Sequence, residues 1–217
     1  MAETRATIDV PGISPVTTAR TAAKGAAWTF IYAPGAGSNI DDPFGRYAAD
    51  AFAIHGITTL RFQFPYMEAG RSGPDRPPVL EATWRAVIAS TQRGKTRLVV
   101  GGRSMGGRIA SMVVADGVAV DALSLFAYPL HPPGHPEKMR AEHLPRIAVP
   151  TLFCSGTRDA FGSPAELRGA IKKVRGAKLH LLDGADHGFS VKKSTGRTKD
   201  DVYEEAVGML VAWLGTL

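Results

Sequence analysis

A serine flanked by glycines is the first feature of this sequence whose residue types and spacing could carry out chemistry. The segment Gly102-Arg103-Ser104-Met105-Gly106 has the pattern G-x-S-x-G, with glycines two residues before and two residues after the serine. The pattern is typical of a sharp turn between a strand and a helix, where side chains at the two glycine positions would collide. Such a turn exposes the serine hydroxyl as a nucleophile at the start of a helix, where developing negative charge is stabilised.

A histidine and an aspartate further along the chain could activate this serine. A serine hydroxyl attacks a carbonyl at neutral pH only when a base accepts its proton and a third group orients that base. Asp159 follows the predicted strand 151–155, and His187 follows the predicted strand 178–182. Among six histidines, only His187 lies in a glycine-containing turn directly after a strand and after the acid. We therefore expect a catalytic triad of Ser104, His187 and Asp159 that transfers an acyl group to water.

Two backbone N–H groups are expected to bind the oxyanion of the tetrahedral intermediate. The first belongs to Met105, the residue after the nucleophile. The second belongs to Ala36, in the glycine-rich stretch 34–37 that follows the predicted strand 28–33. Ala36 and Met105 are thus the predicted oxyanion hole.

Alternating strands and helices must position these residues. Runs of β-branched and aromatic residues predict strands at 28–33, 57–64, 98–100, 122–128, 151–155 and 178–182. Helical spacing of apolar residues predicts helices over 41–55, 79–89, 164–174 and 201–214, and a further helix directly after Ser104. This order predicts the α/β class, with a mostly parallel sheet and helices on both faces. Ser104, Asp159 and His187 then lie at the same edge of the sheet, since each follows a strand.

Two Pro-rich connections, 65–78 and 129–150, also follow strands and are candidate walls of a ligand pocket. The second is about 22 residues long, too short for a separate cap domain. We therefore expect an open pocket that favours small soluble esters or thioesters.

Length and composition set the remaining bounds. With 217 residues, 44% hydrophobic and 21% charged, the chain is expected to form one domain over 1–217, with residues 1–25 as a peripheral strand or a flexible arm. No apolar stretch approaches the ~20 residues of a membrane span, and the first residues do not resemble a secretory signal, so we expect a cytoplasmic protein. The single cysteine, Cys154, excludes an intrachain disulfide and a cysteine-cluster metal site. We expect no metal and no cofactor.

The net charge of +6 is unevenly distributed, because nine basic residues and two acidic ones lie between residues 168 and 199. The basic residues fit the solvated side of a helix and are not interleaved with aromatic residues, which argues against nucleic-acid binding. Arg103, Arg140 and Arg158 are candidates for binding an anionic acyl group, and a surface or structural role is the alternative for each.

Four strings carry a resemblance to a known family: GGRSMGGR, AYPLHPPGHPEKMR, PTLFCSGTRD and GADHGFSVKK. They resemble the small α/β-hydrolases typified by testis-expressed protein thirty and by the hydrolase-like domain of an NSL-complex subunit, over most of the chain beyond about residue 26. The resemblance implies a lidless α/β-hydrolase, distantly related to dienelactone hydrolases, with Ser104, Asp159 and His187 at the triad positions. The chain order serine, aspartate, histidine is also that of α/β-hydrolases.

The expected function is therefore that of a serine hydrolase, a carboxylesterase or thioesterase with an acyl-enzyme intermediate. The alternative is a non-catalytic binding or scaffold protein on the same fold, because a fold alone does not secure activity and the family also contains complex subunits. The intact serine, aspartate and histidine favour the enzyme.

Overall fold

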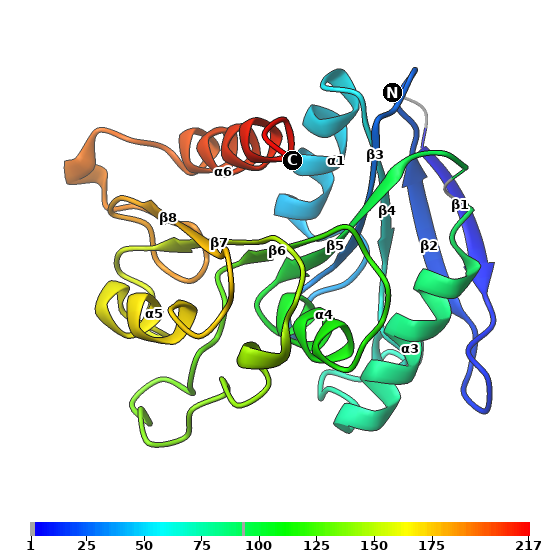
Figure 1. Ribbon diagram of the computed structural model, residues 1–217, viewed down its shortest axis with the longest axis horizontal. Coiled ribbons are helices and arrows are strands. Elements are labelled where there is room, and N and C mark those ends of the chain that lie inside the picture. Colours follow the sequence, from blue (N-terminus) through cyan, green and yellow to red (C-terminus); the bar gives the residue numbers. More distant parts are fainter. Residues whose placement is uncertain (1–2, 93) are drawn as a thin grey trace.

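The computed structural model describes residues 3–92 and 94–217, and its centre is an eight-stranded sheet (Figure 1). The strands are β1 (Glu3–Ile8), β2 (Val16–Thr21), β3 (Trp28–Ala33), β4 (Ile57–Phe62), β5 (Arg97–Arg103), β6 (Ala122–Phe126), β7 (Thr151–Gly156) and β8 (Lys178–Leu182). They lie in the order β1-β2-β4-β3-β5-β6-β7-β8. All neighbours from β4 to β8 pair in parallel. The predicted mostly parallel sheet is confirmed.

The antiparallel part of the sheet comes from the segment 1–25. This segment was predicted to be a peripheral strand or a flexible arm, and its described residues contain two strands, β1 and β2, which pair antiparallel with each other. Strand β2 also pairs antiparallel with β4, so it continues the sheet. Residues 1 and 2 of this segment lie outside the described residues.

Helices cover both faces of the sheet, as predicted. They are α1 (Pro43–Ile54), α2 (Pro65–Glu68), α3 (Pro77–Ser90), α4 (Met105–Ala115), α5 (Pro164–Ile171) and α6 (Lys199–Leu214). Helices α1 and α6 pack on one face, and α3, α4 and α5 pack on the other (Figure 1). Each face therefore has its own hydrophobic cluster.

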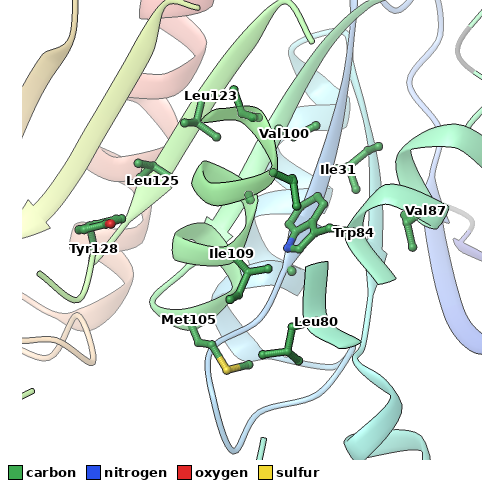
Figure 2. Close-up of a cluster of buried hydrophobic side chains, with 14 of the residues drawn as sticks. Ile31, Leu80, Trp84, Val87, Val100, Met105, Ile109, Leu123, Leu125 and Tyr128 are labelled. Carbon is green, nitrogen blue, oxygen red and sulfur yellow. The ribbon is translucent and has the colours of Figure 1, made fainter. Parts of the chain in front are cut away.

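Trp84 ties helix α3 to the start of helix α4. Its side chain is fully buried and packs edge-on against Phe62, with 4.8 Å between the ring centroids. Figure 2 shows its ring within the cluster, between α3 and Ile109 of α4. The indole N–H donates a hydrogen bond to the carbonyl oxygen of Gly106 at 3.2 Å. Because Gly106 lies in the first turn of α4, this bond helps to fix the helix that begins directly after Ser104.

Aromatic packing on the other face anchors the segment around Phe189. The ring of Phe44 from α1 lies 5.2 Å from the ring of Phe189 and 5.1 Å from that of Tyr203 in α6, measured between centroids. Phe189 is fully buried. Since Phe189 is two residues after His187, this packing holds the loop that carries the histidine.

The connection between β6 and β7 contains only a short 3₁₀ helix, Leu144–Arg146, and no separate cap domain occurs in the described part of the chain. Among residues 3–92 and 94–217, no helix has the length and apolar character needed to cross a membrane.

Candidate active site

Ser104 lies in the turn between β5 and α4, in a backbone conformation that few non-glycine residues adopt. Its φ is 52° and its ψ is −120°, a strained region that costs of the order of 1–3 kcal/mol. The neighbouring glycines permit the turn: a Cβ atom on Gly102 would lie 2.1 Å from the carbonyl oxygen of Ala33, and one on Gly106 would lie 2.3 Å from the same atom. The Ser104 N–H donates to Phe126 O at 2.8 Å, which fixes the residue at the carboxyl end of the sheet.

The structure brings Ser104, His187 and Asp159 together. The Oγ atom of Ser104 lies 2.9 Å from Nε2 of His187. The Nδ1 atom of His187 lies 2.8 Å from Oδ2 and 3.0 Å from Oδ1 of Asp159. A carboxylate only accepts hydrogen bonds, so Nδ1 carries the proton of the neutral imidazole and Nε2 is left to accept the serine O–H. This is the arrangement in which a histidine can remove a proton from a serine.

Asp159 is held in a buried turn that follows β7. Its side chain is only 1% exposed, and its Oδ1 atom also accepts a hydrogen bond from the Phe161 N–H at 2.8 Å. Exclusion of water strengthens the electrostatic attraction between this carboxylate and a protonated His187.

The orientation of His187 is fixed on both sides. The ring of Phe161 stacks on the imidazole, with 4.0 Å between centroids and 26° between planes. The Oδ1 atom of Asp186 accepts hydrogen bonds from the N–H groups of Gly188 and Ser190, at 2.8 and 2.9 Å. Asp186 thus shapes the loop, and the histidine pairs with Asp159 instead.

Arg103 joins the histidine loop to the N-terminus of α1. Its Nη2 donates to the carbonyl oxygen of His187 at 3.1 Å, and its Nη1 lies 3.5 Å from Oδ1 of Asp42. The buried carboxylate of Asp42 also accepts from the Tyr32 hydroxyl at 2.5 Å and from the Gly45 N–H at 2.9 Å. Burial, reinforced by the charge of Asp42, raises the pKa of Tyr32 well above its usual range, so this phenol remains a donor.

A cavity of about 480 Å³ opens in front of Ser104 and His187. Both predicted Pro-rich connections contribute to its wall, with Pro74, Asp75 and Pro77 from the first and Pro129 and Arg140 from the second. The expectation that these connections border a pocket is confirmed.

Ala36 and Met105, the predicted oxyanion donors, both line this cavity. Met105 is the first residue of α4, where the helix does not use the N–H groups itself. The turn that contains Ala36 is closed by a hydrogen bond from the Ser38 N–H to Gly35 O at 3.2 Å. A Cβ atom on Gly35 would lie 3.4 Å from Cβ of Ser104, so the turn passes directly beside the serine.

The arginines differ in their relation to the cavity. Arg140 lines it, whereas Arg158 is outside its wall, with Nη1 donating to Gly184 O at 3.1 Å. Sequence reasoning missed Arg108, which also lines the cavity. Its spacing was an available signal, because the residue four positions after Ser104 in a helix lies on nearly the same face.

In the segments 3–92 and 94–217, no three His, Cys, Asp or Glu side chains gather in a way that could hold a metal ion.

The chain is similar to one family model and to several solved structures. The model of a family described as "alpha/beta hydrolase domain" matches residues 26–215. The protein Est1E from Butyrivibrio proteoclasticus is 14% identical, with a TM-score of 0.76 over 97% of this chain and 99% of that one. A serine hydrolase without a lid from Xanthomonas campestris is 20% identical, with a TM-score of 0.76 over 98% and 95%. A dienelactone hydrolase from Anabaena variabilis is 19% identical, with a TM-score of 0.74 over 95% of each chain. At these low sequence identities, the structural similarity shows that the fold is shared.

Proposed function

We propose that this chain, which belongs to the alpha/beta hydrolase family, is a serine hydrolase that cleaves small soluble esters or thioesters, as a carboxylesterase or thioesterase. The observation that carries the proposal is the continuous chain of contacts from Ser104 Oγ through the His187 imidazole to the Asp159 carboxylate. Family membership alone does not decide activity, so the proposal rests on these side chains.

In the first half of the reaction, the Ser104 oxygen attacks the substrate carbonyl while His187 Nε2 accepts the serine proton. Asp159 stabilises the resulting imidazolium through Nδ1–H. The oxyanion of the tetrahedral intermediate accepts hydrogen bonds from the N–H groups of Ala36 and Met105. When the intermediate collapses, the C–O or C–S bond breaks, and His187 returns the proton to the departing alcohol or thiol. The acyl group remains on Ser104.

In the second half, a water molecule attacks the acyl carbonyl and gives its proton to His187 Nε2. The bond to Ser104 Oγ then breaks, the oxygen recovers the proton from the imidazolium, and the carboxylic acid leaves. The group that acts as base in each attack therefore acts as acid in each collapse.

The cavity supports small substrates. Its volume of about 480 Å³ suits a small molecule, and residues of the loops and of helices α3 and α4 form its wall. A chain-length series of 4-nitrophenyl esters should therefore peak at short acyl groups. A peak at long acyl groups would contradict the proposed substrate size.

A fluorophosphonate probe tests the nucleophile directly. We expect wild-type protein to be labelled and Ser104→Ala to remain unlabelled, with turnover of a 4-nitrophenyl ester reduced by about 10⁴–10⁶-fold. Ser190→Ala is a matched control, since Ser190 is an exposed serine near the histidine, and it should retain labelling. Labelling that persists in Ser104→Ala would place the nucleophile elsewhere. Wild-type protein that is neither labelled nor active would favour the alternative of a binding protein.

A further inference from the structure

Two arginines in the active-site cavity have no carboxylate partner among residues 3–92 and 94–217. Arg108 and Arg140 line the same cavity as Ser104 and His187, and neither forms an ion pair with an aspartate or glutamate there. Arg103, which also lines the cavity, is instead engaged by Asp42 and by the carbonyl oxygen of His187. The charges of Arg108 and Arg140 are thus left for a ligand.

Arg108 is fixed close to the nucleophile by helix α4. Its N–H donates to Ser104 O at 2.9 Å, so the two residues are one helical turn apart. The side chain passes along the same helix, where Nη1 donates to Sδ of Met112 at 3.4 Å. Its Nε atom is buried and has no hydrogen-bond partner among the residues that the structure describes. A buried donor without a partner is costly, so this arginine is kept beside the nucleophile at a cost in free energy.

Arg140 approaches from the connection that follows β6. Its N–H donates to Leu130 O at 2.7 Å, and its carbonyl oxygen accepts the Tyr128 hydroxyl at 2.7 Å. These bonds hold the backbone of Arg140 against the end of the sheet. Burial lowers the pKa of Arg108, and the positive charge of Arg140, which lines the same cavity, also lowers it. Two positively charged side chains in the wall of one cavity favour the binding of an anion there.

The acidic residue in the wall does not neutralise this pair. Asp75 lines the cavity, but its Oδ1 accepts from Arg71 Nη2 at 2.6 Å and its Oδ2 accepts from the Tyr66 N–H at 2.9 Å. Glu81 raises the pKa of Arg108 through its charge, but it does not line the cavity. The wall next to the nucleophile therefore carries an excess of positive charge.

We propose that Arg108 and Arg140 form a subsite for a carboxylate on the substrate, so that the preferred substrates are esters or thioesters that also bear a carboxylate a few bonds from the scissile carbonyl. The planar guanidinium group matches a carboxylate in two parallel hydrogen bonds, which a neutral ester cannot form. This inference rests on the proposed function for its catalytic part and on the arginine pair for its binding part.

Pairs of esters with matched shape test the subsite. Phenyl hydrogen glutarate carries the carboxylate on the acyl side, and phenyl 5-oxohexanoate is its neutral counterpart. On the alcohol side, 3-carboxyphenyl pentanoate is paired with 3-acetylphenyl pentanoate. In at least one pair, wild-type protein should prefer the charged ester in kcat/KM by about tenfold or more. The pair that shows this preference identifies the side on which the carboxylate lies.

Arg108→Gln and Arg140→Gln should lose most of this preference through a higher KM for the charged ester, while turnover of the neutral ester is retained. Arg168→Gln is the matched control, because Arg168 is an exposed arginine of α5 outside the cavity, and it should keep the preference. If Arg108→Gln does not fold, Arg140→Gln in the loop carries the test. A wild-type ratio near one in both pairs would overturn the inference, as would a preference that survives both substitutions.

Binding to Ser104→Ala separates this inference from the proposed function. In calorimetric titrations, the amide analogues glutaranilic acid and 3-pentanamidobenzoic acid replace the two charged esters. The neutral controls are the anilide of 5-oxohexanoic acid and the 3-acetylanilide of pentanoic acid. Binding of a charged analogue that needs Arg108 and Arg140 supports the subsite even if no ester is hydrolysed. Ester hydrolysis without charged-analogue binding would leave the proposed function standing and overturn the subsite.

Discussion

Arg103 donates a hydrogen bond from Nη2 to the carbonyl oxygen of His187 at 3.1 Å. The arginine directly precedes the proposed nucleophile, and the histidine belongs to a loop that follows a different strand. Because the buried carboxylate of Asp42 lies against the other end of the guanidinium, the histidine loop is attached to both β5 and the start of α1. We therefore expect Arg103 to act as a positioning residue, which holds the His187 loop in a fixed relation to Ser104.

Replacing Arg103 by methionine should lower kcat for a neutral ester by about 10- to 100-fold, because small displacements of a catalytic group are costly. KM should change little. Arg103→Lys should recover part of the loss, since it keeps a charged donor near His187 O. Steady-state kinetics between pH 5 and pH 9 measure kcat and KM of both variants, and thermal unfolding checks that each variant is folded. A lysine variant no better than methionine, or a change confined to KM, would contradict the positioning role.

Asp159→Asn should reduce kcat by about 10⁴-fold, because an amide side chain can hold His187 in the wrong tautomer and cannot stabilise its charged form. Asp183→Asn is a suitable control, because Asp183 is exposed and its carboxylate accepts a long hydrogen bond from Thr157 Oγ1 at 3.4 Å. That variant should stay within about twofold of wild type. If Asp159→Asn retained a tenth of the activity, the carboxylate would not have the proposed role.

Two helical glycines should respond oppositely to alanine. In Gly106→Ala, the new Cβ atom would lie 2.3 Å from Ala33 O and 2.5 Å from Pro34 O, so α4 must shift away from β3. We expect a loss of about 3 kcal/mol in the free energy of unfolding. A Cβ atom on Gly169 of α5 meets nothing within 4 Å, and Gly169→Ala should gain about 0.5–1 kcal/mol. Urea denaturation compares the two variants, and equal effects would contradict the close packing of the turn around Ser104.

The strands of the parallel sheet were predictable because their apolar runs are continuous. The strands 28–33 and 178–182 have the predicted bounds. The strand predicted over 57–64 ends at Phe62, since Phe64 is the residue that precedes helix α2. The apolar pattern continues through Phe64 because its ring packs edge-on against Phe62, with 5.3 Å between centroids. A side chain can thus stay in the core after the strand has ended.

Strands β1 and β2 were not predictable as a pair for a different reason. Buried positions of β2 include Thr18 and Thr21, which do not stand out as an apolar stripe. The Thr18 hydroxyl donates to Ala6 O at 3.1 Å, so its burial depends on the pairing with β1. Such polar contacts leave little trace in hydrophobic periodicity.

The residues proposed for catalysis could be predicted from a local motif and from their order along the chain. The contacts of the side chains around them could not, because they arise from the tertiary structure. Ser104 lies in a local pattern, and Asp159 and His187 each follow a strand. The link from Arg103 to Asp42 joins residues 61 positions apart, with no shared motif. The Nε atom of Arg108 is likewise buried, which the sequence around it does not indicate. Sequence spacing could place Arg108 on the right helix face, but it could not show that its charge is unpaired.

His143 lies next to this arginine and is held as a neutral imidazole. The Ser111 hydroxyl donates to Arg108 O at 2.6 Å, so its oxygen is free to accept from Nε2–H of His143, which lies 2.7 Å away. Burial, together with the positive charges of Arg108 and Arg146, lowers the pKa of His143 from 6.5 to about 4. Between these two values, the unfolded chain binds a proton that the folded chain does not bind.

The free energy of unfolding should therefore fall as the pH is lowered from about 6.5 to about 4, because proton binding at residue 143 favours the unfolded chain in this window. Above pH 7 this contribution is absent. In His143→Gln the fall should be shallower, while His55→Gln, which removes an exposed histidine at the end of α1, should follow wild type. Urea denaturation at pH 7.5, 6, 5 and 4.5 measures the difference. Parallel curves for wild type and His143→Gln would mean that this histidine takes up its proton in the folded protein as readily as in the unfolded chain.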